Sequence, residues 1–206
     1  MNNLGNMGAS AIPMLASFML IGAASSVVFE DSDEFAKNAE QTVNEVMEEI
    51  TTYLKIDDII GKYYTNDEGR RVEKIVLLVK PLIQSNIDMS ELTIKICNDN
   101  DVTLLKYSGH SVECNSSETV FENQVWDKTE NAFCLIVIID KDRSLLDYGV
   151  MNKDTAFIAI KLPDRFAMGD DESIIVSLIP SKGITRSIVL ETQSFHISDV
   201  ISFGDV

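Results

Sequence analysis

The stretch Ile12-Pro-Met-Leu-Ala-Ser-Phe-Met-Leu-Ile-Gly-Ala-Ala-Ser-Ser-Val-Val-Phe29 decides how this chain folds, because its eighteen residues are all apolar or small. No charged side chain precedes Glu30, and the first basic residue is Lys37. As an α-helix the stretch would extend about 27 Å, close to the roughly 30 Å hydrocarbon thickness of a bilayer. Pro13 falls in the first turn, where proline is tolerated, and Ser10 is a suitable N-cap. The sequence therefore predicts an N-terminal helix long enough to enter a membrane.

The segment from Asp31 to Leu54 continues with apolar residues at the spacing of one helix face. No Gly or Pro occurs from Phe29 to Ile60, so a single rod of about 45 to 50 residues, roughly 70 Å long, is the simplest prediction. We expect residues 1–60 to form this helix, apolar first and then amphipathic. Residues 61–206 are expected to form a separate β-rich domain, which makes the predicted fold class α+β.

The β-rich domain is indicated by short apolar runs between polar turns. The core of the first run, Ile75 to Val79, is continuously apolar, which predicts burial on both faces. Asn98 to Asp101 lies between two alternating runs and predicts a hairpin turn. Eight or nine strands of this kind favour an antiparallel sandwich or barrel. The expected strands are Val72–Ile83, Leu92–Cys97, Val102–Tyr107, Thr119–Trp126, Phe133–Ile139, Thr155–Leu162, Ser173–Ile179, Arg186–Leu190 and Phe195–Ile201.

Charge and motifs exclude several function classes. The chain has 33 acidic and 17 basic residues, a net charge of -16, so its surface repels nucleic acid, and no Lys/Arg cluster offsets that repulsion. It contains no P-loop, G-x-S-x-G, H-E-x-x-H or G-x-G-x-x-G motif. His110 and His196 are the only histidines, which leaves a His-based triad without support. We predict no catalytic residue, no cofactor and no nucleic-acid partner.

Cysteines and carboxylates offer few ligand patterns. No C-x-x-C spacing occurs among Cys97, Cys114 and Cys134, so a zinc site is not expected. Buried thiols are the favoured prediction. A disulfide between Cys97 and Cys114 is the alternative. Asp140-Lys141-Asp142 and Asp170-Asp171-Glu172 lie at expected strand ends and offer oxygen ligands for Ca²⁺. Because two or three carboxylates fall short of the six to eight ligands that Ca²⁺ takes, no metal site is assigned.

One modification site is indicated. Asn115-Ser116-Ser117 is the chain's only N-x-[ST] sequon, and it lies in a polar stretch between two expected strands. Such a position is expected to be exposed, so Asn115 is a candidate for N-glycosylation.

Three interpretations of the apolar N-terminal segment compete. A cleaved secretory signal would need a positively charged region before it, which this sequence lacks. A transmembrane anchor is expected to have flanking Lys or Arg on its cytoplasmic side. The third interpretation is a mature chain whose basic leader has been removed. Its helix resides transiently in the membrane and then joins a bundle of identical helices. We favour the third and keep the second as an alternative.

The order of these segments resembles the archaellins, the filament subunits of the archaeal flagellum. Bacterial type IV pilins share the helix but usually carry Glu at mature position five, where this chain has Gly5. The segments similar to the family are Ala11–Val28 for its hydrophobic helix, Glu40–Val46 for the amphipathic continuation, Val72–Ile83 and Asn86–Ile94 for the first long strand and its turn, and Asp170–Pro180 with Gly183–Thr185 for the closing strands.

The resemblance implies a non-enzymatic structural subunit of a helical swimming filament. Its helices would bundle in the filament core, and its Ig-like β domains would form the outer sheath, often N-glycosylated. Its partners would be identical or closely related subunits and a membrane assembly machinery that acts after a prepilin-type peptidase. The residues expected to pack in the core are Ile12, Met14, Leu15, Phe18, Met19, Leu20, Ile21, Val27, Val28 and Phe29.

Other functions remain possible from the sequence alone. An adhesive pilus subunit or a minor filament component would share the same helix. A membrane-anchored Ig-like binding domain would stay monomeric in detergent and form no filaments. An extracellular hydrolase would need two acidic residues that converge in a pocket.

Overall fold

A computed structural model describes residues 41–43, 54–66, 69–82, 86–115, 119–194 and 198–204. The chain divides into two compact units, residues 1–46 and 47–206. In the first unit residues 41–43 are described and are helical, in agreement with the predicted amphipathic helix. The expected core-packing residues from Ile12 to Phe29 lie outside the described residues, so the long helix and its contacts stay predictions. Within the described ranges, no helix is long and apolar enough to cross a membrane.

The second unit is built mainly of β-strands. Its main strands are β1 (Leu54–Asn66), β2 (Gly69–Pro81), β4 (Thr93–Cys97), β5 (Val102–Glu113), β6 (Ala132–Ile139), β8 (Thr155–Lys161), β9 (Ser173–Ile179), β10 (Arg186–Glu191) and β11 (Val200–Ser202). Two short strands, β3 (Ile87–Asp88) and β7 (Val150–Met151), pair with each other. The helical elements are α3 (Ser144–Tyr148) and the 3-10 helices η1 (Met89–Glu91), η2 (Val120–Glu122), η3 (Gln124–Lys128) and η4 (Asp164–Phe166).

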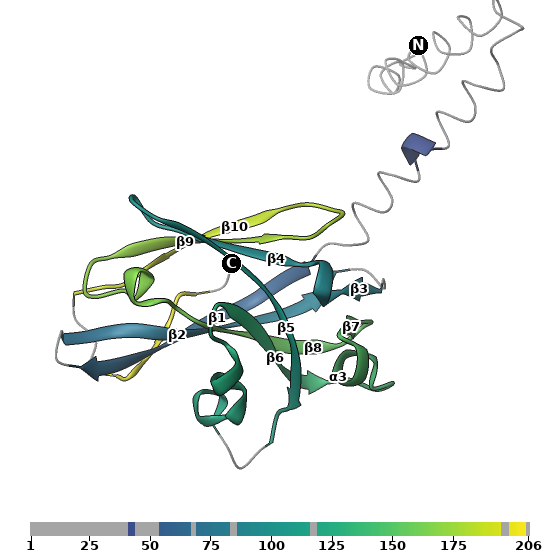
Figure 1. The fold of residues 1–206 in the computed structure, drawn as a ribbon, viewed down its shortest axis with the longest axis horizontal. Helices are drawn as coiled ribbons and strands as arrows, with labels where there is room; N and C mark the ends of the chain where they lie inside the picture. Colours follow the sequence, from purple (N-terminus) through teal and green to yellow (C-terminus); the bar gives the residue numbers. More distant parts are fainter. Residues whose placement is uncertain are drawn as a thin grey trace, which may run out of the picture. The chain divides into compact units, whose positions relative to one another are not determined.

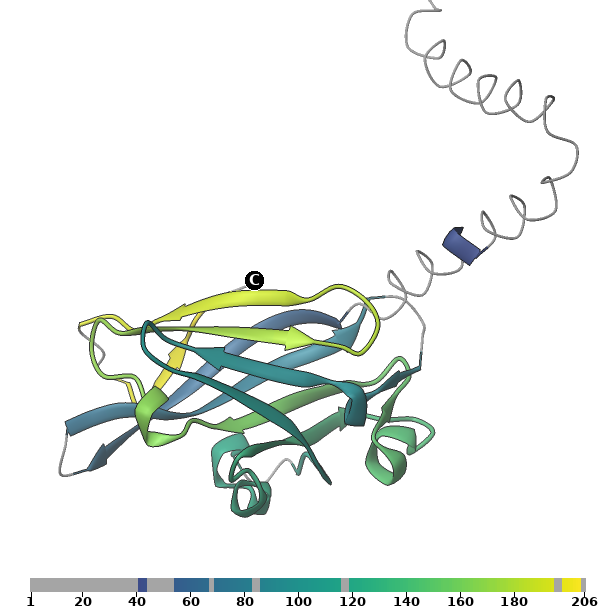
Figure 2. The ribbon, with the colours of Figure 1, turned by 45° about the horizontal axis from the view of Figure 1, so that its top comes forward.

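The main strands form one curled nine-stranded sheet in the order β10-β9-β4-β5-β6-β8-β2-β1-β11. Figure 1 and Figure 2 show β10, β9 and β4 in a first layer and β6, β8, β2 and β1 in a second, with β5 crossing between them. The predicted sandwich-like β domain is therefore confirmed. The prediction of a purely antiparallel sheet is wrong at one place, because β5 and β6 run parallel.

Strand β5 carries the sheet from the first layer to the second. It pairs with β4 at its start, and its register to β6 shifts between Tyr107 and Ser111. Gly109 lies inside this shift with a φ of 77°, a conformation that favours glycine. Such an irregularity bends a strand and increases its twist. The sheet therefore folds over at this irregularity, and β5 pairs with β6 on both sides of it.

Most of the predicted apolar runs are strands where the sequence placed them. Ile75 and Leu77 join the main core between the layers and Val76 joins a second cluster, so this run is buried on both faces as predicted. The turn between β4 and β5 is also confirmed, because Asn98 Oδ1 accepts from the backbone N–H of Asp101 at 2.7 Å. The last expected strand, 195–201, overlaps β11 at 200–201, and 195–197 lie outside the described residues.

Strand β1 corrects the prediction of a helix through residue 60. Residues 54–60 are extended, and Gly61, the first residue of the expected β-rich domain, lies inside the same strand. The pairing of β1 with β2 has a register shift between Ile56 and Asp58. Because this bulge interrupts the period of two, Ile56 and Ile59 are both buried although they are three residues apart. The predicted helix extends to residue 60 because no Gly or Pro interrupts the sequence there, and that absence does not exclude a strand.

The segment 119–126, expected to be a strand, forms η2 and η3 instead. The Asn123 side chain accepts from the backbone N–H of Val125 at 3.0 Å, and Trp126 Nε1 donates to the carbonyl of Val120 at 2.9 Å. Such local bonds give the backbone an alternative to a sheet ladder. The apolar side chains of this segment cover the outer face of the second layer. The cluster that they form consists of Phe121, Val125 and Trp126 over Val76, Cys134, Ile136 and Ala159.

Candidate functional site

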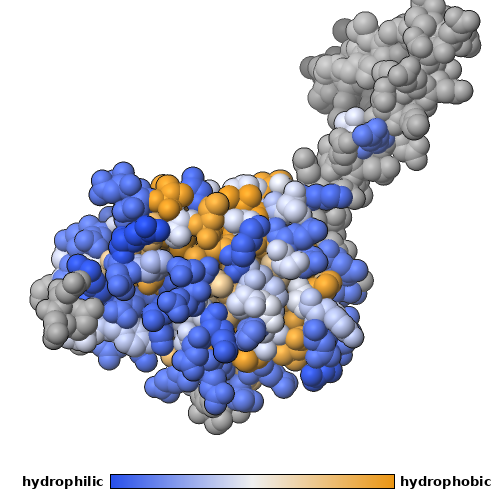
Figure 3. All heavy atoms as spheres, viewed as in Figure 1, coloured by the Kyte–Doolittle hydropathy of each residue, from blue (hydrophilic) through white to orange (hydrophobic). Residues whose placement is uncertain are grey.

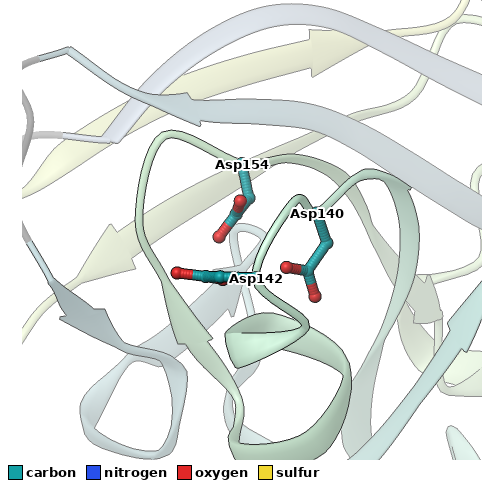
Figure 4. Close-up of side chains that lie close together, drawn as sticks. All are labelled: Asp140, Asp142 and Asp154. Atoms are coloured by element: carbon teal, nitrogen blue, oxygen red, sulfur yellow. The ribbon is translucent and has the colours of Figure 1, made fainter.

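Three carboxylates meet at the end of the second layer where β6 and β8 adjoin. Asp140 directly follows β6 and Asp154 directly precedes β8, and the pairing of Ile139 with Thr155 brings these two positions together. Asp142 reaches the same place from the loop before α3. One ligand oxygen from each side chain lies within 4.8 Å of the others, and Figure 4 shows the three side chains gathered between the loops.

Backbone N–H groups orient the three carboxylates. Each side chain accepts one such bond: Asp140 from Leu146 at 2.9 Å, Asp142 from Ser144 at 3.0 Å and Asp154 from Asn152 at 2.7 Å. The other Asp140 oxygen, Oδ1, is buried and has no hydrogen-bond partner. Asp154 is the most enclosed of the three, with 2% of its surface exposed. One carboxylate oxygen is thus left without the compensation that burial normally requires.

The electrostatics of the cluster favour a bound cation. Burial, with the charges of Asp140 and Asp142 nearby, raises the pKa of Asp154, although a hydrogen bond from Asn152 acts in the opposite direction. Hydrogen bonds from Ser144 hold the pKa of Asp142 below its usual range. Three carboxylates this close repel one another when all are ionised, and a bound cation would relieve that repulsion. Oxygen ligands of this kind suit Ca²⁺, and backbone carbonyls or water would have to complete its coordination.

The second acidic run, residues 170–172, does not form a comparable group. The Asp171 carboxylate accepts from Ser194 Oγ at 2.7 and 2.8 Å, and Glu172 accepts from the backbone N–H of Gly169 at 2.7 Å. Across the described ranges, Asp140, Asp142 and Asp154 are the one group of three metal-type ligands.

Sequence reasoning noted Asp140 and Asp142 but missed Asp154. The available signal was its position directly before the expected strand 155–162, just as Asp140 directly follows the expected strand 133–139. The two residues could have been joined only by assuming that these strands are neighbours. Nothing in the sequence fixes that pairing.

Asn115 of the sequon lies in the loop after β5. The residue before it, Cys114, is held to β6 by a backbone hydrogen bond from its N–H to the carbonyl of Val137 at 2.7 Å. Asn115 itself is exposed, whereas residues 116–117 lie outside the described ranges. An exposed loop asparagine is accessible to a glycosylating enzyme, but its modification stays a prediction.

The cysteines form no disulfide. All three thiols are free, so the Cys97–Cys114 bridge is not made. Cys134 is buried as predicted, and burial raises the pKa of its thiol. The prediction of buried thiols is wrong for Cys97 and Cys114, which are partly exposed, although Cys114 packs against the cluster formed by Phe121, Val125 and Trp126.

Known proteins resemble this chain along most of its length. The family model described as archaeal-type flagellin matches residues 5–190. Flagellin B3 of Methanocaldococcus jannaschii is 26% identical over 208 residues, which cover 96% of this chain and 94% of that protein. The match includes both the apolar N-terminal stretch and nearly the whole β domain.

Two solved structures share the fold. The crystal structure of archaeal flagellin FlaB1 from Methanocaldococcus jannaschii has a TM-score of 0.62 at 19% identity and covers 72% of this chain and 94% of that chain. The archaeal flagellum of Methanospirillum hungatei strain JF1 has a TM-score of 0.50 at 17% identity and covers 93% of this chain and 96% of that chain.

Proposed function

Because the chain belongs to the archaeal-type flagellin family, we propose that its apolar segment, residues 12–29, is a helix that packs against copies of itself in the core of a swimming filament. Family membership makes the chain a structural subunit of the extracellular archaeal filament used for motility, and not an enzyme. It assembles with copies of itself or with related subunits.

The driving force for assembly is the burial of apolar side chains. Each large apolar side chain removed from water contributes about 1.5 to 3 kcal/mol, so the ten predicted core residues supply roughly 15 to 30 kcal/mol per subunit before the entropic cost of association. A contact repeated between unlike surfaces gives an open helix when the rotation between neighbouring subunits does not close a ring. One apolar segment can therefore hold together a filament of unlimited length.

The observation that carries this proposal is the extent of the family match. It begins at residue 5, so it contains the eighteen-residue stretch without a charge as well as the β domain. Val43, which lies on the apolar face predicted for the following helix, is 60% exposed in the single chain. A neighbouring subunit would cover such a side chain.

The β domain is proposed to be the Ig-like outer part of the subunit. The excess of acidic over basic residues in the β domain favours solvation of that surface and repulsion between filaments. A glycan on the exposed Asn115 would add to both. Before assembly, the apolar helix would reside in the membrane, after removal of a basic leader by a prepilin-type peptidase, and a membrane assembly machinery would then add the subunit.

A matched pair of variants tests the proposed core. In cells that depend on this chain for filaments, Ile21→Asp is expected to abolish sheared surface filaments and swimming, because an aspartate in a packed apolar core costs several kcal/mol. Val200→Asp is the control, because Val200 is 42% exposed on β11 and should accept a carboxylate. Normal filaments of the Ile21→Asp protein in electron micrographs would refute a core role for this segment.

A further inference from the structure

The outer face of the first layer carries apolar side chains that the strand pattern does not explain. Strands β10, β9, β4 and β5 bury one alternating set of side chains in the main core, so the opposite set should be polar where it faces water. Instead Val189, Leu104 and Val102 are 61%, 60% and 58% exposed, and Ile175 is 40% exposed. Figure 3 shows hydrophobic side chains gathered over β9, β10 and β4 in the upper part of the domain.

The pairing register places these side chains in one row. Val189 lies opposite Ile175, Ile175 lies opposite Cys97, and Cys97 lies opposite Val102. Side chains directly opposite on one face are about 5 Å apart at their Cβ atoms, so the row is continuous. Leu104 extends it into the next row on β5. These five residues are called the outer stripe below.

Several polar side chains beside the outer stripe are already hydrogen-bonded to each other. Ser177 and Ser187, beside the stripe, share a hydrogen bond of 2.8 Å between their hydroxyls. Lys106 Nζ donates to Thr93 Oγ1 at 2.6 Å. Covering polar groups that are already bonded to each other avoids most of the cost of desolvation. These polar groups therefore oppose a contact little, whereas the Lys95 ammonium on the same face favours a partner that carries a carboxylate.

The charge of the face is opposite to that of the whole chain. Its outward strand positions carry Lys95 and Lys106, with Glu191 at the rim, whereas the β domain as a whole has more acidic than basic residues. Two copies of such a chain repel each other over most of their surfaces. The lysines of this face attract acidic residues of a second copy, so this is a place where two copies can meet.

We propose that the outer stripe is a contact between subunits, covered in the filament by the acidic surface of the outer domain of a second copy of this chain. The proposal rests on the proposed function, since it requires a filament. The stripe and the acidic surface are different patches, so their contact is heterologous and can repeat along an open helix. This second contact would fix how neighbouring outer domains sit, in addition to the helices at the centre.

Cys97, in the middle of the outer stripe, is a native probe for the contact. Intact sheared filaments and subunits released from them with a non-denaturing detergent are treated with N-ethylmaleimide, and the alkylation rate of each cysteine is measured by mass spectrometry. We expect the Cys97 rate to be about tenfold lower in filaments than in released subunits, because reagent access controls thiol reactivity. Cys134, which is buried in the single chain, should react slowly in both samples.

Two variants test the energetic role of the stripe. Val189→Asp places a carboxylate on the apolar row opposite an acidic partner, and the filaments should then dissociate under milder detergent conditions or fail to form. Val200→Asp is the control, since it changes an exposed valine of a different edge strand away from this face. A slow Cys134 reaction in released Val189→Asp protein would show that the variant is folded.

The outcomes separate this proposal from the proposed function. Equal Cys97 rates in filaments and in released subunits, or normal stability of Val189→Asp filaments, would overturn the contact while the filament itself remains. If Cys97 reacted slowly in released subunits as well as in filaments, another segment of the same chain would cover the outer stripe. That result would also overturn the proposed contact. Absence of wild-type filaments would instead contradict the proposed function.

Discussion

Replacing Trp126 tests how η3 is held on the second layer. The indole is 7% exposed, and its Nε1 donates to the carbonyl of Val120 at 2.9 Å. Its ring stacks on Phe121 with centroids 6.0 Å apart, and Lys74 Nζ lies 4.8 Å from the ring centroid. Trp126→Ala removes all of these contacts and leaves a cavity over the sheet.

The expected losses follow from these contacts. Loss of a buried tryptophan lowers the free energy of unfolding by about 3 to 5 kcal/mol. Trp126→Phe keeps most of the buried area and loses the hydrogen bond, so its cost should be about 1 to 2 kcal/mol. Tyr148→Ala is the control, because Tyr148 is 80% exposed and its replacement should change stability by less than about 0.5 kcal/mol.

The assay is urea unfolding of the full-length protein in a mild detergent, followed by circular dichroism because the variants lack the chain's only tryptophan. A second readout is the thiol of Cys134, whose Sγ lies 3.4 Å from the carbonyl of Lys128 at the end of η3. Trp126→Ala should speed its alkylation. If Trp126→Ala were as stable as Tyr148→Ala and its Cys134 thiol stayed unreactive, the packing of η3 described above would be refuted.

Four further predictions address other parts of the molecule. A Cβ at Gly61 would lie 2.9 Å from Val72 Cγ1, so Gly61→Val should lower the free energy of unfolding by about 1 to 3 kcal/mol through overpacking; an unchanged melting temperature would contradict this. If Asp140, Asp142 and Asp154 bind Ca²⁺, a concentration of about 100 times the Kd should stabilise the protein by about 2.7 kcal/mol, and Asp154→Asn should abolish that gain; an unchanged melting temperature in Ca²⁺ would exclude the site. In a chelator, the raised pKa of Asp154 means that stability falls as pH rises from 3.8 through that pKa, and Asp154→Asn should flatten this decline in pH-dependent melting; equal slopes would exclude the assignment. Asn115→Gln should remove a glycopeptide and speed electrophoretic migration, whereas unchanged migration would show that Asn115 is unmodified.

Local patterns in the sequence were sufficient to predict most strands and turns of the β domain. Runs such as Ile75 to Val79 and turns such as Asn98 to Asp101 determine their own conformation, because apolar continuity and side-chain capping act over a few residues. Strand β1 was missed because no Gly or Pro separates residues 54–60 from the preceding helical pattern, and its pairing with β2 is not visible in the local sequence. Propensity cannot reveal a register that is set by a partner strand.

The candidate sites were less accessible to sequence reasoning for the same physical reason. Asp154 joins Asp140 only because β6 and β8 are neighbours, and Cys97 lies between Ile175 and Val102 only because β4 is inserted between β9 and β5. Each site is made by long-range strand pairing. The exposed Asn115, by contrast, was predicted correctly as a loop position, since polar residues between two apolar runs indicate a loop locally.

Helical reconstruction of filaments sheared from cells, by electron cryomicroscopy, tests the central claim most directly. We predict that residues 12–29 of each subunit lie as helices around the filament axis, in contact with the same residues of neighbouring subunits, with the β domains outside. A detergent-free protein that stays soluble and monomeric, with residues 12–29 packed on its own sheet and no filament formed, would contradict the account.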